Sequence, residues 1–510
     1  MQERRPMLWP RHGEGQIQIG VGLGMSGWRF ALNCYFLQVR EGVFGRFMGL
    51  KSALDLIHFD GANIMAQPAG TMRAGTLDPT FADDGVLRLP RPVISGVRPV
   101  AVLPLPEGKL LVAILLSGID APVALARLNE DGSFDTRFGE HGTGFVEIYM
   151  EETTLDVWEL LALSDGGWLV IGNYTLPAGG GLYVVRYHED GKLDASFGEK
   201  GLRLLPYDDM GGPTDIGVSV DVSGQDDETA SLRTSRSAGG SAALDGKIFL
   251  RHSVTTDSGQ RKGVVIRLNS DGSTDYTFNG VGFVLIELEG ISYDYNSPES
   301  IAVQADGKVL VVGQYALNSL AARGAYVTRF DAMGRLDKGF NGGVVTVSHS
   351  SLIVMRDVAV SATDGRIVAV GRAFRNGALH GLMFVVTRDG FFDYSFNRGQ
   401  PLFSALAPKG LGWRRCVLQS DGSILVAGST GSGFAEEGLT ALTARFRSDG
   451  SLDPTFNDNG FVIFDEDEMY ESVEDMAVMP DGRIVVCGLG WVDGDPWADI
   501  NAGWVIRYLV

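Results

Sequence analysis

Short apolar runs joined by Asp-Gly pairs recur along most of this chain. Four clear examples are LSDGGWLVIGN (163–173), VQADGKVLVVGQ (303–314), LQSDGSILVAGS (418–429) and VMPDGRIVVCGL (478–489). The runs are too short for helices, and a two-residue Asp-Gly turn between two of them is typical of an antiparallel hairpin. The pattern therefore predicts an all-β chain built from repeated hairpins.

A second pattern, the G-x-x-D-x-x-F motif, occurs seven times, each time shortly after an apolar run. We expect the aspartate to cap a single helical turn, and the phenylalanine that closes the turn to point inward as a wedge. Both residues are thus predicted to be structural rather than catalytic. The seven pairs are Asp78 and Phe81, Asp135 and Phe138, Asp194 and Phe197, Asp275 and Phe278, Asp337 and Phe340, Asp393 and Phe396, and Asp453 and Phe456.

The spacing of the motif indicates the architecture. Successive aspartates lie 57, 59, 81, 62, 56 and 60 residues apart, and each interval holds a hairpin and two further strands. Four short strands in a period near 60 are typical of one propeller blade. We predict a seven-bladed β-propeller of four-stranded antiparallel blades. An N-terminal strand at about 85–89 should pair with the C-terminal strands of 473–510, which closes the ring and removes an exposed sheet edge.

The hairpin DGKVLVVG together with DGSLDPTFNDNG resembles the bacterial delta-60 repeat family, across 74–510. The resemblance implies a β-propeller of unestablished function and supplies no catalytic residues. Two segments depart from the repeat. Residues 223–244, rich in Ser, Gly and Asp, are expected to be a flexible surface insertion. Residues 1–73 are expected to lie outside the propeller, as a disordered arm or a mis-assigned start.

Charge and composition limit the classes of partner that this chain is expected to bind. The net charge of −20 disfavours nucleic acids and anionic lipids. The three cysteines, Cys34, Cys416 and Cys487, fit neither a disulfide framework nor a zinc site. We find neither a secretory signal nor an apolar run long enough to cross a membrane, which predicts a cytoplasmic monomer by default. Export by a non-classical route remains open.

Loops that differ between repeats are where propellers usually hold ligands, and two such loops combine aromatic side chains with carboxylates. This combination suits a sugar ring, a basic peptide or a cation. The alternative is an acidic rim in which the aromatic rings pack between blades. The candidate ligand-binding residues are Tyr293, Asp294 and Tyr295 in 289–300, and Trp491, Asp493, Asp495, Trp497 and Asp499 in 490–501.

The sequence thus predicts a non-catalytic binding scaffold for a protein, peptide or carbohydrate ligand. We identify no catalytic residues, no metal ligands and no cofactor, although a divalent cation remains compatible with the acidic loops. The alternative is an enzyme, a hydrolase or lactonase or a lyase, with an acidic site at the channel mouth. Three or more acidic side chains converging at the channel entrance would favour that alternative.

Overall fold

The computed structural model of this chain describes residues 73–92, 94–116, 122–139, 142–177, 179–207, 246–255, 259–317, 323–348, 352–431, 439–466, 469–492, 500 and 502–510. Secondary structure within these ranges is β-strand, with short 3-10 turns at Pro106–Gly108, Asn341–Gly343 and Asn397–Gly399. The insertion predicted at 223–244 and nearly all of the extension predicted at 1–73 lie outside the described residues.

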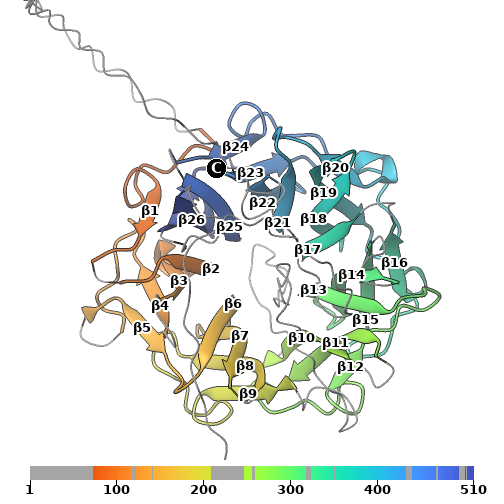
Figure 1. Ribbon diagram of the computed structural model, residues 1–510, viewed down its shortest axis with the longest axis horizontal. Helices are drawn as coiled ribbons and strands as arrows, with labels where there is room; N and C mark the ends of the chain where they lie inside the picture. Colours follow the sequence, from red (N-terminus) through yellow and green to blue (C-terminus); the bar gives the residue numbers. More distant parts are fainter. Residues whose placement is uncertain are drawn as a thin grey trace, which may run out of the picture. The chain divides into compact units, whose positions relative to one another are not determined.

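Five sheets have four antiparallel strands each, and they lie around a ring (Figure 1). In hydrogen-bonding order, the first two sheets are β2 (Arg98–Pro104), β3 (Leu110–Leu115), β4 (Val123–Leu128) and β5 (Phe145–Ile148), and then β6 (Thr154–Ala162), β7 (Trp168–Leu176), β8 (Gly179–Tyr187) and β9 (Leu202–Pro206). Two further sheets are β17 (Ile353–Val360), β18 (Ile367–Arg375), β19 (Ala378–Val386) and β20 (Leu402–Ser404), and then β21 (Leu411–Leu418), β22 (Ile424–Thr430), β23 (Ala441–Phe446) and β24 (Phe461–Phe464). The fifth sheet is β1 (Val86–Leu89), β27 (Ala502–Tyr508), β26 (Ile484–Val492) and β25 (Met469–Val478).

A sixth sheet combines two groups of strands. One group is β10 (Ile248–Thr255), β11 (Arg261–Leu268) and β12 (Phe283–Leu285), and the other is β13 (Tyr295–Val303), β14 (Val309–Ala316), β15 (Gly324–Phe330) and β16 (Val344–Val347). A single parallel pair, Arg261 with Tyr295, joins the groups. The predicted all-β propeller of four-stranded antiparallel sheets is confirmed. The count of seven stays a prediction, because 208–245, just before β10, lie outside the described residues.

Strands from the two ends of the propeller pair with each other. Val86 of β1 lies opposite Ile506 of β27, and Leu89 lies opposite Gly503, in an antiparallel register. The sheet that contains β25 also packs against β2, so that the first and last sheets of the propeller are neighbours (Figure 1). The predicted closure between 85–89 and the C-terminal strands is therefore confirmed.

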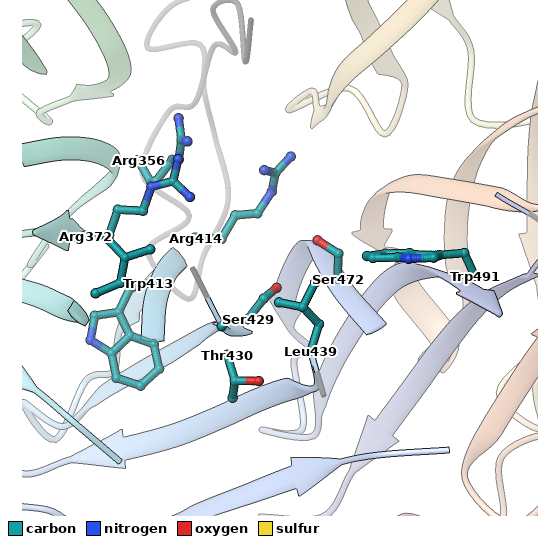
Figure 2. A pocket seen from close by; sticks show the side chains of 12 residues that line it. Arg356, Arg372, Trp413, Arg414, Ser429, Thr430, Leu439, Ser472 and Trp491 are labelled. Carbon is teal, nitrogen blue, oxygen red and sulfur yellow. The ribbon is translucent and has the colours of Figure 1, made fainter. Parts of the chain in front are cut away.

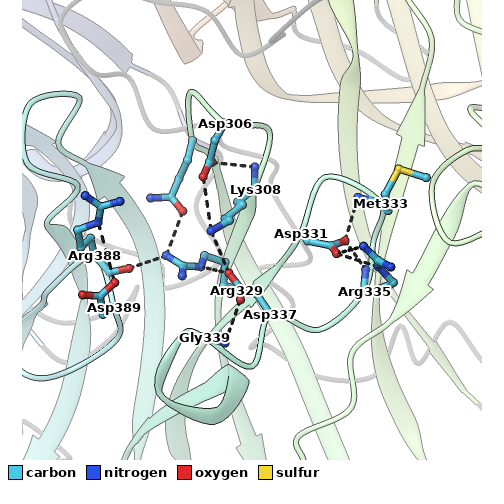
Figure 3. A network of polar contacts seen from close by, with 11 residues as sticks. Asp306, Lys308, Arg329, Asp331, Met333, Arg335, Asp337, Gly339, Arg388 and Asp389 are labelled. Atoms are coloured by element: carbon cyan, nitrogen blue, oxygen red, sulfur yellow. Dashed lines mark hydrogen bonds and ion pairs between the residues drawn. The ribbon is translucent and has the colours of Figure 1, made fainter.

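The motif aspartate joins its own turn to a neighbouring arginine. Asp337 accepts a hydrogen bond from the Gly339 N–H at 3.0 Å on one oxygen, and the other oxygen lies 2.9 Å from Arg329 Nε (Figure 3). Arg329 also donates to the carbonyl of Arg388 in the next repeat. Burial opposes ionisation, but Arg329 and the Gly339 N–H outweigh it and lower the pKa of Asp337.

All seven motifs have an arginine at this position in space. In five of them the arginine comes eight residues before the aspartate, a spacing that is visible in the sequence. In the sixth motif, the position eight residues before the aspartate is Val385, and the paired arginine comes instead from the Asp-Gly hairpin. In the first, the arginine comes from the other end of the chain. The pairs are Arg507 with Asp78, Arg127 with Asp135, Arg186 with Asp194, Arg267 with Asp275, Arg329 with Asp337, Arg366 with Asp393, and Arg445 with Asp453.

Each motif phenylalanine is buried against a glycine of the following motif. At Gly334, with φ of +81°, an added Cβ would lie 3.0 Å from the ring of Phe278. Only glycine combines this backbone with so close a ring. The contacts run in a circle, because the last phenylalanine reaches the first glycine. The pairs are Phe81 with Gly132, Phe138 with Gly191, Phe197 with Gly272, Phe278 with Gly334, Phe340 with Gly390, Phe396 with Gly450, and Phe456 with Gly75.

Candidate functional site

A cavity of about 130 Å³ lies where β17–β19, β21–β22 and β25–β26 meet. We call it the arginine cavity, because three guanidinium groups extend toward it above two serine hydroxyls (Figure 2). Its walls combine cationic, hydroxyl and apolar side chains. The lining residues are Arg356, Arg372, Leu379, Gly412, Trp413, Arg414, Ser429, Thr430, Gly431, Leu439, Ser472 and Trp491.

Bulges in the inner strands place two of the arginines. The register of β17 shifts between Met355 and Asp357, and that of β21 shifts between Trp413 and Arg415. The extra residues are Arg356 and Arg414. A bulge re-aims a side chain that regular alternation would send elsewhere, and it is common beside functional sites. The same position holds Glu299 in β13 and Glu474 in β25.

Buried polar side chains next to these bulges hold the inner strands together. Asp357 accepts hydrogen bonds from the Ser300 hydroxyl at 2.9 Å and from the Cys416 N–H at 3.0 Å. Asp475 accepts in the same way from Arg415 Nε at 3.0 Å and from the Val102 N–H at 2.9 Å. Because each carboxylate spans two neighbouring sheets, the bulged arginines sit on a fixed frame.

Carboxylates from adjacent sheets lie beside two of the guanidinium groups. Arg414 Nη2 lies 2.5 Å from Glu474 Oε2, and Arg356 Nη1 lies 3.9 Å from Glu299 Oε2. Burial raises the pKa of Glu299 to about 7, against the opposing charge of Arg251. Two of the three guanidinium groups thus lie beside a carboxylate, and that of Glu299 is only partly ionised near neutral pH.

The aromatic residues predicted to bind ligand occupy different environments. Tyr293 is 7% exposed, and its hydroxyl lies 3.0 Å from Glu287 Oε2, so its ring packs inside the fold rather than facing solvent. Tyr295 is partly buried, with the Arg261 guanidinium 5.3 Å from its ring. Asp294 is exposed, and its backbone carbonyl accepts from the Arg261 N–H.

Of the predicted site residues that the structure describes, Trp491 alone lines the arginine cavity. Its ring is 3% exposed and packs 5.6 Å from the ring of Tyr470. The structure does not bring Trp491 and Tyr293 together, because the sheets of β17–β20 and β21–β24 lie between theirs (Figure 1). The other predicted residues, Asp493, Asp495, Trp497 and Asp499, lie outside the described residues. The predicted ligand surface therefore stays a prediction.

Sequence reasoning overlooked the three cavity arginines. A signal was present for Arg356 and Arg414 but not for Arg372: the inner strands carry two adjacent charged residues at one position, RD at 356–357, RR at 414–415 and ED at 474–475. Charged pairs inside apolar strands are costly unless they are compensated, which marks them as unusual. Alternation alone cannot show that the first member of each pair is bulged.

Residues 465–471, which end next to the cavity residue Ser472, are rich in Asp and Glu, and the last of them, Glu471, is deeply buried. Glu471 is fully buried, and its Oε1 accepts a hydrogen bond from the Glu466 N–H at 2.9 Å. Burial, together with the nearby charges of Asp465 and Glu466, raises the pKa of Glu471 to about 8. An acid with a raised folded pKa costs stability as the pH rises from its ordinary value toward the folded value.

Glu471→Gln should therefore stabilise the protein increasingly as the pH rises from about 4.5 to about 8, and fully above that. At pH 9 the wild-type carboxyl is ionised and buried, so the variant should melt roughly 2–4 °C higher. At pH 5 the folded carboxyl is neutral and only the unfolded chain is ionised there, so the melting temperatures should differ much less than at pH 9. Differential scanning calorimetry at both pH values tests this, with the exposed Glu147→Gln as the matched control. A difference that is the same at pH 5 and pH 9 would contradict the assignment.

The described ranges contain neither a cluster of metal ligands nor a helix that could span a membrane. Within them, no three or more His, Cys, Asp or Glu side chains are grouped so as to hold a metal ion. The same ranges hold no helix of the length and apolar character needed to span a membrane.

The chain matches the model of a β-propeller family described as a domain of unknown function, DUF5122. The matched stretches are 123–138, 163–197, 244–278, 304–340 and 419–456, each of which ends near a motif phenylalanine. This match supports a β-propeller family, whereas the delta-60 resemblance stays a prediction. No protein in a search of curated proteins matches this chain.

Solved structures similar to this chain include proteins of several kinds. A polysaccharide lyase, ulvan lyase, is 10% identical with a TM-score of 0.42, over 83% of this chain and 96% of its own. The β-propeller domain of a Pyrococcus furiosus trilobed protease is 8% identical with a TM-score of 0.38, over 78% and 92%. A prolyl endopeptidase is 10% identical with a TM-score of 0.39, over 79% of this chain, which spans 50% of the endopeptidase's length.

Proposed function

We propose that this protein is a non-catalytic binding scaffold that holds its ligand in the arginine cavity. The observation that carries the proposal is the convergence of Arg356, Arg372 and Arg414 on one cavity in a chain with a net charge of −20. Guanidinium groups that gather in one cavity repel one another, and an anionic ligand offsets that repulsion.

The position of the cavity supports a binding role. Thr430 ends β22, Trp491 lies near the end of β26, and Leu379 lies near the start of β19. These strand ends lie away from the Asp-Gly turns and the motifs, on the side whose loops differ between repeats. We call this side the variable-loop face. Loops on a rigid sheet scaffold are where propellers commonly bind ligands.

The chemistry of the walls favours binding over catalysis. Among the described residues, the lining side chains supply guanidinium and hydroxyl groups but neither a carboxylate nor an imidazole. Glu474 approaches from a neighbouring strand but is held in an ion pair with Arg414, whereas Glu299 does not line the cavity and accepts a hydrogen bond from Gln314 at 2.8 Å. A general acid or base must reach the bound substrate with a proton to give or to take, and an ion-paired carboxylate is poorly suited to that task.

Filling the cavity should abolish binding. In Ser472→Trp a large ring replaces a small side chain in the cavity wall, whereas Thr136→Trp makes a similar change at an exposed position of a motif. On peptide and glycan arrays, ligands retained by the wild type and by Thr136→Trp should bind Ser472→Trp at least tenfold more weakly. Far-UV circular dichroism checks that both variants fold. Equal retention by Ser472→Trp, or chemical turnover of a retained ligand, would contradict the proposal.

A further inference from the structure

Asparagine followed by glycine is a pair that readily loses the side-chain amide, because glycine leaves the next backbone nitrogen accessible. The reaction has two structural requirements. The asparagine side chain must be free to reach the backbone nitrogen of the glycine, and that nitrogen must be free of a hydrogen bond. The described residues contain four such pairs: Asn279-Gly280, Asn341-Gly342, Asn376-Gly377 and Asn459-Gly460.

Three of the pairs are held by hydrogen bonds. The Gly342 N–H donates to a backbone carbonyl at 3.1 Å, and the Gly460 N–H donates to another at 2.7 Å. The Asn279 side chain donates through Nδ2 to the Phe283 carbonyl at 3.1 Å. Each of these bonds must break before the two reacting groups can meet, and local opening of this kind costs free energy.

Asn376 and Gly377 form the two-residue turn between β18 and β19. Arg375 lies opposite Ala378 at the end of the ladder, and φ is +53° at Asn376 and +85° at Gly377, as in a type I′ turn. Both turn residues are exposed, and Phe374 just before them is 43% exposed. Among the described residues, neither the Asn376 side chain nor the Gly377 N–H makes a hydrogen bond. This pair therefore meets both requirements, unlike the other three.

The surroundings of the pairs differ in the same direction. Two of the other asparagines directly follow a motif phenylalanine and the third lies three residues after one, and all three rings are fully buried: Phe278, Phe340 and Phe456. Opening these turns far enough for the reaction disturbs a buried contact between repeats. Opening the pair of Arg375 and Ala378 only frays the end of one hairpin, which costs less.

We propose that Asn376 is a site of spontaneous deamidation in the folded protein. The backbone nitrogen of Gly377 forms a bond to Cγ of Asn376 and gives its proton to hydroxide. The bond from Cγ to Nδ2 breaks, and Nδ2 takes a proton from water and leaves as ammonia. Water then opens the cyclic succinimide. Breaking the new bond to Cγ gives aspartate at 376, whereas breaking the bond from nitrogen to the backbone carbonyl carbon gives isoaspartate.

Either product changes the variable-loop face. A carboxylate replaces a neutral amide next to Arg375, whose guanidinium lies 4.3 Å from the ring of Phe403. Isoaspartate also adds one atom to the backbone of the turn, so a two-residue turn can no longer keep Arg375 opposite Ala378. Leu379, which follows directly, lines the arginine cavity. The modification thus alters the chain next to the cavity as the protein ages.

Peptide mapping by mass spectrometry tests this proposal on the full chain, incubated in mildly alkaline buffer. Asn376 should convert about tenfold faster than Asn341 and Asn459, and faster than Asn279 as well. In guanidinium chloride the four rates should become similar, because the turns and hydrogen bonds that separate them are lost. Conversion of any other pair as fast as Asn376 in the folded protein overturns the proposal, as does the same order of rates in denaturant.

Two glutamine variants assign the change in charge to this turn. Glutamine needs a larger ring and closes it far more slowly, so Asn376→Gln should lose the acidic species that isoelectric focusing detects in the aged wild type. Asn341→Gln, at another exposed Asn-Gly pair, should accumulate that species at the wild-type rate. Circular dichroism checks that both variants fold. Equal accumulation in Asn376→Gln and in the wild type overturns the proposal.

Discussion

Replacing Arg507 with methionine is expected to lower the free energy of unfolding by about 3–5 kcal/mol. The Arg507 side chain is completely buried, and its Nε lies 2.7 Å from Asp78 Oδ2. It also donates to the Glu130 carbonyl at 2.5 Å and lies 4.6 Å above the ring of Phe81. Methionine fills similar space but leaves the Asp78 carboxylate, itself 1% exposed, without its main partner. The loss falls where the two ends of the propeller meet.

Guanidinium chloride unfolding, followed by tryptophan fluorescence, measures this effect. Arg73→Met is the control, because Arg73 pairs with Asp458 near the same end but both side chains are mostly exposed, at 61% and 79%. It should change stability by less than about 0.5 kcal/mol. The double variant Asp78→Asn/Arg507→Met should recover part of the loss, because it removes the buried charge left behind. Equal effects of Arg507→Met and Arg73→Met would show that the buried pair does not secure the closure.

Truncating a motif phenylalanine should be about as damaging. Phe278→Ala is expected to cost about 3–5 kcal/mol, since the ring is fully buried and its removal leaves a cavity between two repeats. The ring contacts Gly334 of the next motif, and the Arg267 guanidinium lies 4.6 Å above it. The Arg267 side chain cannot easily move in to fill this cavity, because it is also held by Asp275.

The same motif offers a matched control. Tyr276 lies two residues before Phe278 and is 69% exposed, so Tyr276→Ala removes an aromatic ring of similar size from the surface. Its effect on unfolding should stay within about 0.5 kcal/mol. Thermal and chemical unfolding of the two variants, measured side by side, separate the inward wedge from the outward ring. A cost for Phe278→Ala no larger than that for Tyr276→Ala would refute the wedge.

The repeat made most of the fold predictable. Asp337 and Phe340 could be assigned a capping and a wedging role from spacing alone, because a tight turn allows few arrangements of residues three apart. The incomplete repeats at the two ends predicted the pairing of β1 with β27, since each end lacks the strands that the other supplies. Short apolar runs and the Asp-Gly turns between them specified the hairpins.

The arginine that pairs with each motif aspartate could be predicted from the sequence in only some of the repeats. Arg329 lies eight residues before Asp337, so a repeat alignment could have paired them. Arg507 and Asp78 are 429 residues apart, and only the closed ring makes them neighbours. The same holds for Arg366, which reaches Asp393 from a hairpin because Val385 occupies the usual position.

The candidate site depended on the tertiary structure far more than the fold did. Bulges in β17 and β21 aim Arg356 and Arg414 at the cavity, and a bulge adds one residue in a way that alternation cannot reveal. Packing between sheets also decided that the rings of Tyr293 and Trp491 are buried.

The sequence by itself determined the repeat, the hairpins and the closure of the propeller, because these follow from local turn geometry and from burying one strand edge against another. Only the tertiary structure decided which side chains meet at the variable-loop face. A site of this kind is formed by residues from separate sheets, here Arg372 in β18, Arg414 in β21 and Ser472 in β25, whose distances from one another are set by the packing of the sheets and not by their separation along the chain.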